Sequence, residues 1–388
     1  MINLIASENI VSDNVCEALG SVFTNKYAEG YPHLRYYGGN EVTDKLEEIT
    51  KERALKLFRL SPKKWSVNVQ PYSGSPANLA VLHALVPIGA KIMAMALPMG
   101  GHLTHGHKAS ITGKLWKQVA YGVSEKTGRI DYDAVMRIAK KENPKIIIAG
   151  ATAYSRIINF KKFKQIANAV GAVFMVDMSH FAGLVAGRVY PSPFIYADVV
   201  TTTTHKTLRG PRAALIFSKI EFSKAIDKTV FPGLQGGPHM NQIAGIAVAL
   251  KEARKPEFKK YSRQIIKNAR TLAKELKKYG WKIISNGTDT HLFLMDTIAR
   301  GVSGKIASGR LESAGIIVNK NMIPFDLRKP SDPSGIRVGT PTVTTRGMKE
   351  REMKIIAGII SKTLLREEKE NEIKTGVAKL CRKFLIKL

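Results

Sequence analysis

Residues 199–207 read Val-Val-Thr-Thr-Thr-Thr-His-Lys-Thr, and this stretch decides the fold expected for the chain of 388 residues. Valine and threonine favour a strand, and the strand ends at His205 and Lys206, at the edge where parallel sheets carry their functional side chains. A lysine that is partly buried there loses solvation, which disfavours its charged form. The neutral amine can attack a carbonyl carbon and form a Schiff base. Lys206 is therefore the first candidate for a reactive residue.

Short apolar runs on both sides of this stretch predict a parallel sheet. The runs are apolar on both faces, which is typical of strands buried inside such a sheet. Segments with helical periodicity alternate with them, and this alternation favours an α/β domain with helices on both faces of the sheet. The predicted strands are 91–97, 145–149, 172–177, 198–202 and 213–217, and the predicted helices are 76–86, 132–142 and 160–170.

The pattern changes after the glycine-rich segment Phe-Pro-Gly-Leu-Gln-Gly-Gly-Pro at 231–238. A long helix is predicted at roughly 240–279, and helical segments then separate short strands. We therefore predict two domains. Residues 1–244 form an N-terminal segment and a large cofactor-binding domain, and residues 245–388 form a smaller α+β domain. The strands predicted in the second domain are 281–285, 291–296 and 336–339.

The composition excludes several classes of protein. With 44% hydrophobic residues the chain can bury a large core, but no stretch has the ~20 apolar residues that a membrane helix needs. The start of the chain lacks the basic and apolar regions of a signal peptide. Cys16 and Cys381 lie too far apart in the sequence to suggest a metal motif or a disulfide framework. We expect a cytoplasmic protein with reduced thiols and no metal site.

The net charge is strongly positive. Lys and Arg number 61 against 31 Asp and Glu, which gives +30, and residues 251–282 alone hold 12 basic residues against 3 Glu. Such an excess could attract nucleic acid or another polyanion, or it could cover a solvated helix face. Aromatic residues do not alternate with the charges as a base-stacking surface requires. We therefore favour the solvated helix and do not expect nucleic acid as the partner.

Two further features give Lys206 a chemical context. Asp177 ends the strand 172–177, where a carboxylate can keep a ring nitrogen protonated, although it could also cap the next helix. Ser73, Gly74 and Ser75 precede the helix 76–86, whose backbone N–H groups can bind a phosphate. Many helices begin with such residues, so this motif is weak alone. A phosphate site, a ring-nitrogen partner and a Schiff-base lysine in this order are much more specific.

His102 and Arg337 extend the predicted site. His102 follows two glycines after the strand 91–97, so it could lie flat against an aromatic ring, or it could be structural. Arg337 lies in an extended segment of the second domain. A buried arginine is costly without an anion, and its planar guanidinium suits a carboxylate, either that of a substrate or that of an internal ion pair.

The motifs that carry these residues resemble those of the serine hydroxymethyltransferase family, from Leu4 to about Gly347. So many matching segments in the same order do not arise by chance. The motifs are LIASEN (4–9), TNKYAEGYP (24–32), RYYGGNE (35–41), GGHLTHG (100–106), VDM (176–178), VVTTTTHKTLRGPR (199–212), FPGLQGGP (231–238), GTDTHLFL (287–294) and SGIRVGTP (334–341).

The resemblance implies a fold-type-I pyridoxal-phosphate enzyme, with active sites shared across a tight homodimer. It implies that Lys206 carries the cofactor, that Asp177 pairs with the ring nitrogen, and that His102 stacks on the ring. The remaining roles within one subunit follow in the same way. They are the phosphate (Ser73, Gly74, Ser75), the ring oxygen (Ser155, His180), the substrate carboxylate (Arg337, Ser7) and the neighbourhood of the reactive lysine (His205, Thr203).

The resemblance also implies contributions from the partner subunit and a second substrate. Tyr27 and the backbone of Gly236 and Gly237 would complete the phosphate site, and Glu29 and Tyr37 would face the hydroxymethyl group. Glu29 would be the best candidate for proton transfer. The second substrate would be a reduced pterin, and the positions that match its site are Leu97, Gly101, His102, Leu103 and Asn321.

The implied reaction is the reversible conversion of serine and a reduced pterin to glycine and the methylene-pterin. An alternative is a pterin-independent aldolase that cleaves threonine or allo-threonine, because the same lysine, aspartate and arginine would serve it. A third reading is a nucleic-acid-binding protein on an old enzyme scaffold. It predicts decay of the site, whereas Lys206, Asp177, His102, Glu29 and Arg337 are all present.

The sequence departs from the family pattern in two places. Family members carry a longer segment before LIASEN, with a helix that embraces the partner, whereas here the motif begins at Leu4, so the start is naturally short or the sequence is truncated. In the loop 324–333, Lys329, Pro330 and Ser331 replace a Ser-Pro-Phe-like folate contact. We therefore hypothesise a modified pterin, such as a tetrahydromethanopterin-like carrier with an anionic tail, which a basic surface would suit.

Overall fold

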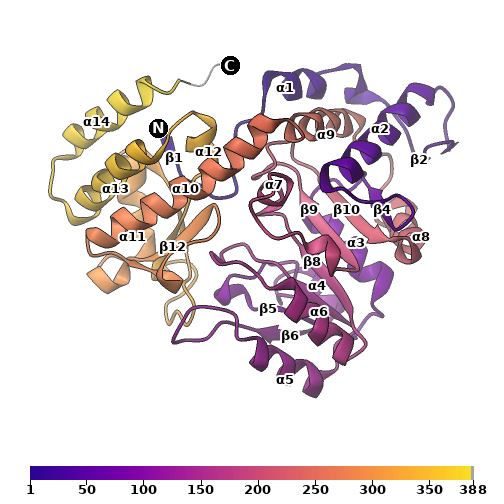
Figure 1. The fold of residues 1–388 in the computed structure, drawn as a ribbon, viewed down its shortest axis with the longest axis horizontal. Coiled ribbons are helices and arrows are strands. Elements are labelled where there is room, and N and C mark those ends of the chain that lie inside the picture. The colour runs from indigo at the N-terminus through magenta and orange to yellow at the C-terminus, as the bar shows by residue number, and fades with distance from the viewer. Residues whose placement is uncertain (386–388) are drawn as a thin grey trace.

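A seven-stranded sheet organises the larger of two lobes in the computed structural model, which describes residues 1–385 (Figure 1). The strand order is β4-β10-β9-β8-β7-β5-β6, and the five strands from β9 to β6 run parallel. Their carboxyl ends therefore meet at one edge of the sheet. The strands are β4 (Trp65–Asn68), β5 (Lys91–Met95), β6 (Lys117–Tyr121), β7 (Ile146–Ala149), β8 (Val173–Asp177), β9 (Val199–Thr203) and β10 (Ala214–Lys219).

Every strand predicted in this lobe is present, with two differences in the sheet. β10 is antiparallel to β9, because the short connection at 204–213 returns the chain beside the strand that it leaves. The edge strands β4 and β6 escaped prediction. β6 reads Lys-Gln-Val-Ala-Tyr and is only partly buried, so it lacks the continuous apolar run that marks the inner strands.

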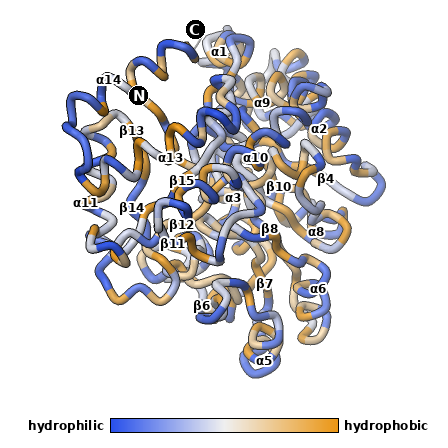
Figure 2. Tube along the Cα trace, turned by 60° about the vertical axis from the view of Figure 1, so that its left-hand side comes forward, coloured by the Kyte–Doolittle hydropathy of each residue, from blue (hydrophilic) through white to orange (hydrophobic). Residues whose placement is uncertain are grey.

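Helices cover both faces of this sheet, and two hydrophobic clusters fill the spaces between. Successive residues of a strand contribute to opposite clusters, as Ile147 and Ile148 of β7 do, because side chains alternate along a strand. Figure 2 shows hydrophobic colours along β7 and β8, two of these inner strands. The helices of this lobe are α1 (Asp13–Leu19), α2 (Glu41–Phe58), α3 (Gly74–Leu85), α4 (Ile111–Leu115), α5 (Tyr132–Glu142), α6 (Phe160–Ala169), α7 (Ala182–Ala186), α8 (Ile220–Lys228) and α9 (Met240–Ala253).

The smaller lobe is built on an antiparallel four-stranded sheet with the order β11-β12-β15-β14. It has its own apolar core, as the predicted α+β domain requires. The N-terminus belongs here too, since β1 (Ile2–Asn3) pairs with β13 (Ile316–Ile317). The other elements are β11 (Lys282–Ile283), β12 (Leu292–Asp296), β14 (Asn319–Asn321), β15 (Gly335–Gly339), α10 (Pro256–Lys278), α11 (Gly304–Ser313), α12 (Pro341–Thr345), α13 (Glu350–Leu365) and α14 (Glu370–Arg382).

The single long helix expected at 240–279 is two helices. Pro256 occupies the first turn of α10, where its missing N–H costs nothing, and the chain bends just before it. α9 packs on α1 and α2, whereas α10 packs on α13. The predicted domain boundary after residue 244 falls inside α9. The change from one core to the other comes within α10, whose first half adds Phe258, Ile265 and Ile266 to the core of the larger lobe and whose second half adds Leu272, Ala273 and Leu276 to that of the smaller lobe.

The basic stretch lies largely on α10, as the solvated-helix interpretation expects. The apolar residues of α10 face the core, and its lysines lie mostly on the opposite, exposed side. No helix in residues 1–385 has an apolar segment long enough to cross a membrane.

One buried ion-pair network anchors the segment that carries Tyr27, Glu29 and Tyr37. β2 (Gly30–Tyr31) and β3 (Leu34–Arg35) form a small hairpin there. Arg35 donates from Nε to Asp44 and from Nη2 to Glu47, both at 2.8 Å, and its Nη1 donates to the carbonyl oxygens of Ala28 and Gly30. Its side chain is 3% exposed and that of Glu47 is 0% exposed.

We predict that Arg35→Ala lowers the free energy of unfolding by about 3 kcal/mol, because it removes the buried guanidinium that pairs with both carboxylates, and Lys51 at 3.4 Å from Glu47 compensates only in part. The midpoint of urea denaturation measures this. The exposed pair Lys56–Glu52 is the matched control, and Lys56→Ala should cost less than about 1 kcal/mol. A midpoint for Arg35→Ala as close to the wild type as that of the control would contradict the prediction.

Candidate active site

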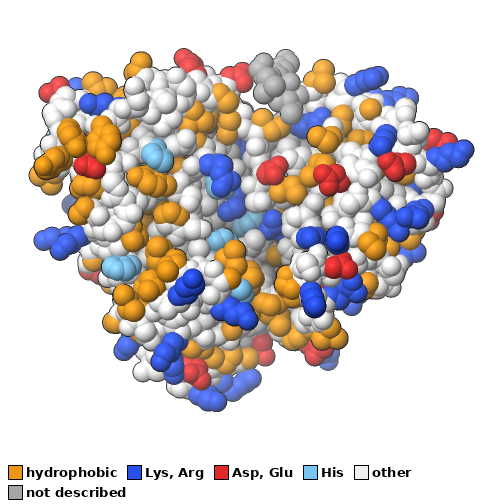
Figure 3. Space-filling view, turned by 180° about the vertical axis from the view of Figure 1, so that it is seen from behind, with side chains coloured by type: hydrophobic (Ala, Val, Ile, Leu, Met, Phe, Trp, Pro, Cys, Tyr) orange, Lys and Arg blue, Asp and Glu red, His pale blue; other side chains and the backbone are white. Residues whose placement is uncertain are grey.

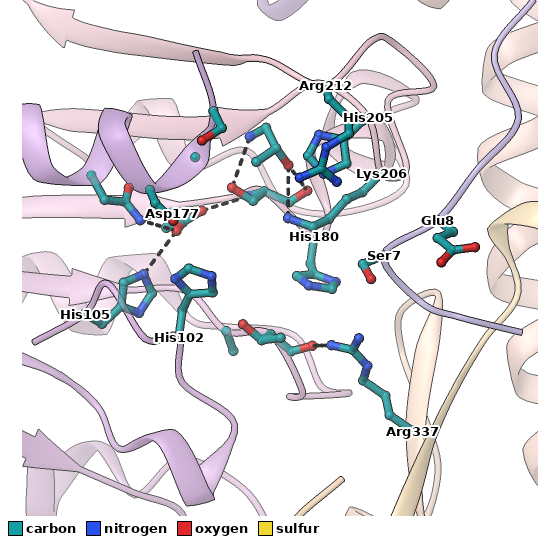
Figure 4. Close-up of a pocket in the computed structure, with 18 residues that line it drawn as sticks. Ser7, Glu8, His102, His105, Asp177, His180, His205, Lys206, Arg212 and Arg337 are labelled. Atoms are coloured by element: carbon teal, nitrogen blue, oxygen red, sulfur yellow. Dashed lines mark hydrogen bonds and ion pairs between the residues drawn. The ribbon is translucent and has the colours of Figure 1, made fainter. Parts of the chain in front are cut away.

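A cavity of about 350 Å³ opens where the carboxyl ends of β8 and β9 meet the start of α3. Seen from behind, lysine, arginine and histidine side chains gather in the middle of the molecule, between the two lobes (Figure 3). In the close-up, Lys206, His102 and His180 point into the cavity, and Arg337 reaches it from the smaller lobe (Figure 4). The N-terminal segment passes over one side, where Ser7 and Glu8 line the cavity.

Asp177 is the buried carboxylate of the site. Its Oδ2 accepts a hydrogen bond from Asn78 at 2.8 Å and lies 3.0 Å from Nε2 of His105, while Oδ1 accepts from the N–H of Ser179 at 3.0 Å. Burial alone would raise the pKa of Asp177, but His105, His102 and Ser179 hold it well below its usual range. The carboxylate therefore stays ionised inside the protein.

Lys206 lies just beyond β9, and its Nζ donates to Oγ1 of Thr203 at 3.1 Å. Burial lowers the pKa of Lys206 to about 8; Asp177 opposes this shift, and Arg337 and Arg212 add to it. Near neutral pH the neutral fraction of this amine is thus much larger than that of an exposed lysine, although the charged form still predominates. The neutral form is the state that attacks a carbonyl carbon.

The first turn of α3 provides an anion site. Ser73 is the N-cap residue but makes no side-chain capping bond, and Ser73, Gly74 and Ser75 all line the cavity. A Cβ at Gly74 would approach Cγ2 of Thr203 to 2.7 Å, so glycine is required for the close contact between α3 and β9. The free N–H groups and the helix dipole favour a phosphate at this end.

Arg337 is 6% exposed, and no carboxylate lies within ion-pair distance of it in residues 1–385. Its Nε donates to Asn319 at 3.0 Å and its Nη1 to the carbonyl oxygen of Thr152 at 2.9 Å. Desolvation lowers the pKa of Arg337 to about 10. A buried guanidinium without a counter-ion is a site for a ligand's carboxylate.

His102 and His205 are neutral histidines of the cavity. Burial lowers the pKa of His102 to about 4, with a further contribution from His105, and lowers that of His205 to about 3, with contributions from Lys206 and Arg212. His102 is also oriented, because its Nδ1 lies 2.8 Å from Oγ1 of Thr104. It can therefore present a neutral ring face to an aromatic ligand.

Comparison with known proteins agrees with this geometry. The sequence model of the family described as serine hydroxymethyltransferase matches residues 1–360. A curated serine hydroxymethyltransferase from Acidothermus cellulolyticus is 54% identical over 378 residues, which cover 97% of this chain and 85% of that protein. The chain belongs to the serine hydroxymethyltransferase family. Its enzymes use pyridoxal phosphate on a fold-type-I scaffold, and the mostly parallel seven-stranded sheet fits that scaffold.

The residues of this cavity fit pyridoxal phosphate. Lys206 supplies the amine, α3 a phosphate site, and Asp177 an ionised partner for the ring nitrogen. The ring Nδ1 of His205 is buried and lacks a hydrogen-bond partner among residues 1–385. This site contains a buried carboxylate, a lysine whose pKa is lowered, and a ring nitrogen without a hydrogen-bond partner. Such a combination is typical of a site that binds a ligand.

The structure brings eleven of the predicted site residues together. All eleven line the cavity: Ser7, Ser73, Gly74, Ser75, His102, Asp177, His180, Thr203, His205, Lys206 and Arg337. The predicted positions that do not line it are Tyr27, Glu29, Tyr37, Ser155, Gly236, Gly237, Leu97, Gly101, Leu103 and Asn321.

Ser155 does not line the cavity, although it was predicted to lie near the ring oxygen of the cofactor. The hydroxyl of Ser155 bonds to Oγ of Ser285 at 3.0 Å and to the carbonyl oxygen of Gly287 at 3.1 Å, so it helps to join the two lobes. Thr152, three positions earlier in the same loop, lines the cavity instead. Either hydroxyl would suit the ring oxygen, and only the folded loop distinguishes them.

Sequence reasoning also missed several contributors. His105 and Arg212 lie inside motifs that were recognised, but nothing in their spacing indicated that His105 would bond to Asp177 or that Arg212 would reach the cavity. Asn78 was missed because it lies on a helix. Its Nδ2 donates to Thr104 at 2.9 Å as well as to Asp177, so it orients both.

We predict that Asp177→Asn lowers the pKa of Lys206 below about 8, because it removes the carboxylate that favours the charged amine. The pH dependence of Lys206 acylation in the cofactor-free protein, followed by peptide mass spectrometry, measures this pKa. The exposed Lys63 serves as an internal reference. An unchanged or higher midpoint for Lys206 in the variant would contradict the assignment.

Proposed function

We propose that this protein converts serine and a reduced pterin reversibly to glycine and the methylene-pterin, through the cavity around Lys206. The observation that carries the proposal is that one cavity contains Lys206 with a lowered pKa, an ionised Asp177 and an Arg337 without a carboxylate partner among residues 1–385. Family membership over residues 1–360 supports the same reaction.

The chain's own groups divide the work in this proposal. Arg337 and Ser7 bind the carboxylate of serine, α3 binds the phosphate, and His102 supports the ring. Asp177 keeps a proton on the ring nitrogen, because its carboxylate stays ionised. When bound, pyridoxal phosphate supplies a ring that accepts the electron pair released as the Cα–Cβ bond of serine breaks. Thr203 orients the amine of Lys206 through the 3.1 Å bond.

We propose that the remaining residues act in the cavity of a partner subunit in a homodimer. Tyr27, Glu29 and Tyr37 form an exposed cluster outside the cavity: the Tyr27 and Tyr37 rings lie 5.2 Å apart, and the hydroxyl of Tyr27 lies 3.3 Å from Glu29. Gly236 and Gly237 adjoin this cluster, since a Cβ on Gly237 would lie 3.7 Å from Cγ of Glu29.

The exposure of this cluster supports a shared site. Tyr27 is 57% exposed and Tyr37 is 47% exposed in the single chain, although both belong to motifs that resemble active-site motifs. Large aromatic side chains at such exposure are typical of an interface. In the dimer, Glu29 would transfer a proton at the hydroxyl of serine or at the pterin.

We propose that the pterin binds beside His102, at the positions Leu97, Gly101, Leu103 and Asn321. We also propose that the enzyme is cytoplasmic. Gly101 packs against β5 so closely that a Cβ would lie 2.0 Å from the carbonyl oxygen of Met95. The loop at 324–333 lies near Asn321, and its Lys329 is exposed. An exposed cation there supports a carrier with an anionic tail.

The test is serine cleavage measured in parallel without a pterin, with tetrahydrofolate and with tetrahydromethanopterin. We expect strong dependence on a pterin and faster turnover with tetrahydromethanopterin. Equal or faster turnover with tetrahydrofolate would overturn the modified carrier alone. Pterin-independent cleavage, with threonine turned over as fast as serine, would indicate an aldolase. Lys206→Ala should abolish both turnover and the visible absorbance of the bound cofactor, and retention of either would sink the assignment of Lys206.

Mixed dimers test the shared site. We predict that a dimer of one Glu29→Gln chain and one Lys206→Ala chain, purified with two different tags, has about half of the wild-type activity, because one of its two sites is intact. The matched control pairs a wild-type chain with a Glu29→Gln/Lys206→Ala chain, which leaves no intact shared site. The opposite pattern, an inactive mixed dimer and a half-active control, would show that each chain builds its site alone.

A further inference from the structure

A chain of buried hydrogen bonds leads from β9 and α3 to the ring of His102. Oγ1 of Thr201 donates to Oδ1 of Asn78 at 2.7 Å. Nδ2 of Asn78 donates to Oδ2 of Asp177 at 2.8 Å and to Oγ1 of Thr104 at 2.9 Å. Oγ1 of Thr104 in turn lies 2.8 Å from Nδ1 of His102. Asn78, Thr104 and Thr201 are at most 6% exposed, so the protein rather than water supplies these bonds.

The charge of Asp177 fixes the orientation of the Asn78 amide. An ionised carboxylate only accepts hydrogen bonds, so the NH₂ group of Asn78 faces it, and the carbonyl oxygen of Asn78 faces the hydroxyl of Thr201. The second hydrogen of the NH₂ group points to Thr104. Oγ1 of Thr104 therefore accepts from Asn78, and the hydrogen of its own hydroxyl is left to be donated to another group.

A backbone donor decides the direction of the last bond. The N–H of Thr104 donates to Nδ1 of His102 at 3.2 Å. An N–H group cannot accept, so Nδ1 of His102 is the acceptor and carries no proton. The hydroxyl of Thr104 leads to the same result, because Nδ1 of His102 is the only acceptor that it reaches in residues 1–385. The ring proton of His102 is therefore on Nε2.

A turn that is anchored at both ends holds the two donors of Thr104 against the ring. The N–H of His105 donates to the carbonyl oxygen of His102 at 3.0 Å, which closes the turn around Thr104. A Cβ on Gly101 would approach a carbonyl oxygen of β5 to 2.0 Å, so the turn begins directly against the sheet. At its other end, Nε2 of His105 lies 3.0 Å from Asp177. Thr104 therefore has a fixed position relative to His102.

We propose that Thr104 is a positioning residue that fixes His102 as the tautomer protonated on Nε2. Asn78 assists, because its N–H group directs the hydroxyl of Thr104 toward Nδ1. His102 points into the cavity (Figure 4), and its Nε2 has no partner among residues 1–385, so the N–H there can donate to an acceptor atom of a ligand. The effect on turnover rests on the proposed function, whereas the tautomer is a property of the protein alone.

The tautomer is measured on the full-length, cofactor-free protein by NMR with ¹⁵N-labelled histidine, with the His102 signals assigned from a His102→Gln variant. The measurement is made near neutral pH, well above the pKa of His102, which is about 4. We expect wild-type His102 to carry its proton on Nε2 and to have an unprotonated, hydrogen-bonded Nδ1. A wild-type His102 protonated on Nδ1 would overturn the proposal, and so would a mixture of the two tautomers.

Two variants of Thr104 test the part played by its hydroxyl. Thr104→Val keeps the branched shape and the backbone N–H but removes the hydroxyl, so Nδ1 of His102 accepts one hydrogen bond instead of two. Its ¹⁵N resonance should then move toward that of a nitrogen without a donor. Thr104→Ser keeps the hydroxyl and is the matched control, so it should keep the wild-type resonance. An unchanged resonance in Thr104→Val, or an equal shift in both variants, would overturn the role of the hydroxyl.

Turnover provides a second readout. Thr104→Val should lower kcat for serine by up to about tenfold, which is the factor that the loss of one hydrogen bond can produce. KM should change little, because the groups that bind the phosphate and the carboxylate are unchanged. Thr104→Ser should recover most of the loss in kcat, and equal losses in the two variants would overturn the positioning role. A wild-type protein that does not cleave serine would refute the proposed function and leave the NMR result to decide the tautomer.

Discussion

The buried carboxylate of Asp177 is the constraint on which the site depends. A carboxylate inside a protein is costly unless hydrogen bonds and opposite charge replace the water that it loses. Here the replacements come from α3 through Asn78, from the loop after β5 through His105, and from the backbone just after β8. The hydrogen bonds to this one carboxylate therefore fix the relative positions of three segments. The same segments carry the phosphate site, His102 and the turn that leads to His180.

The same charge balance sets the properties of the other groups. Lys206, Arg212 and Arg337 bring positive charge to a cavity where Asp177 and Glu8 are the carboxylates among the lining residues. Burial is the main reason that the pKa values of Lys206, His102, His180 and His205 are lowered, and the neighbouring cations add to this effect. An amine with a lowered pKa, neutral rings and an unpaired guanidinium suit a ligand with a carbonyl carbon, an aromatic ring and a carboxylate. The charges that line the cavity are thus complementary to the charges of such a ligand.

The sequence predicted the inner strands and the cavity residues at strand ends, because continuous apolar runs mark buried parallel strands and functional side chains follow them. It did not predict β6, whose edge position makes it polar, or the break before α10, where Pro256 begins a new helix inside an unbroken helical pattern. Contacts such as Asn78 to Asp177 depend on how a helix is rotated against a sheet. Thr152 and Ser155 show the same limit within one loop, since both are hydroxyl residues and only the backbone path decides which one faces the cavity.

The smaller lobe takes part in the chemistry because it supplies groups that the large sheet cannot. Arg337 lies on β15, and Ser7 belongs to the N-terminal segment that β1 joins to the same lobe. Direct contacts hold these groups over the cavity: Arg337 donates to Thr152, Ser155 bonds to Ser285 and Gly287, and His291 meets His180. A shift between the lobes would therefore move the carboxylate site and the histidine pair together relative to Lys206. The polar contacts between the two lobes therefore determine how far the carboxylate site lies from Lys206.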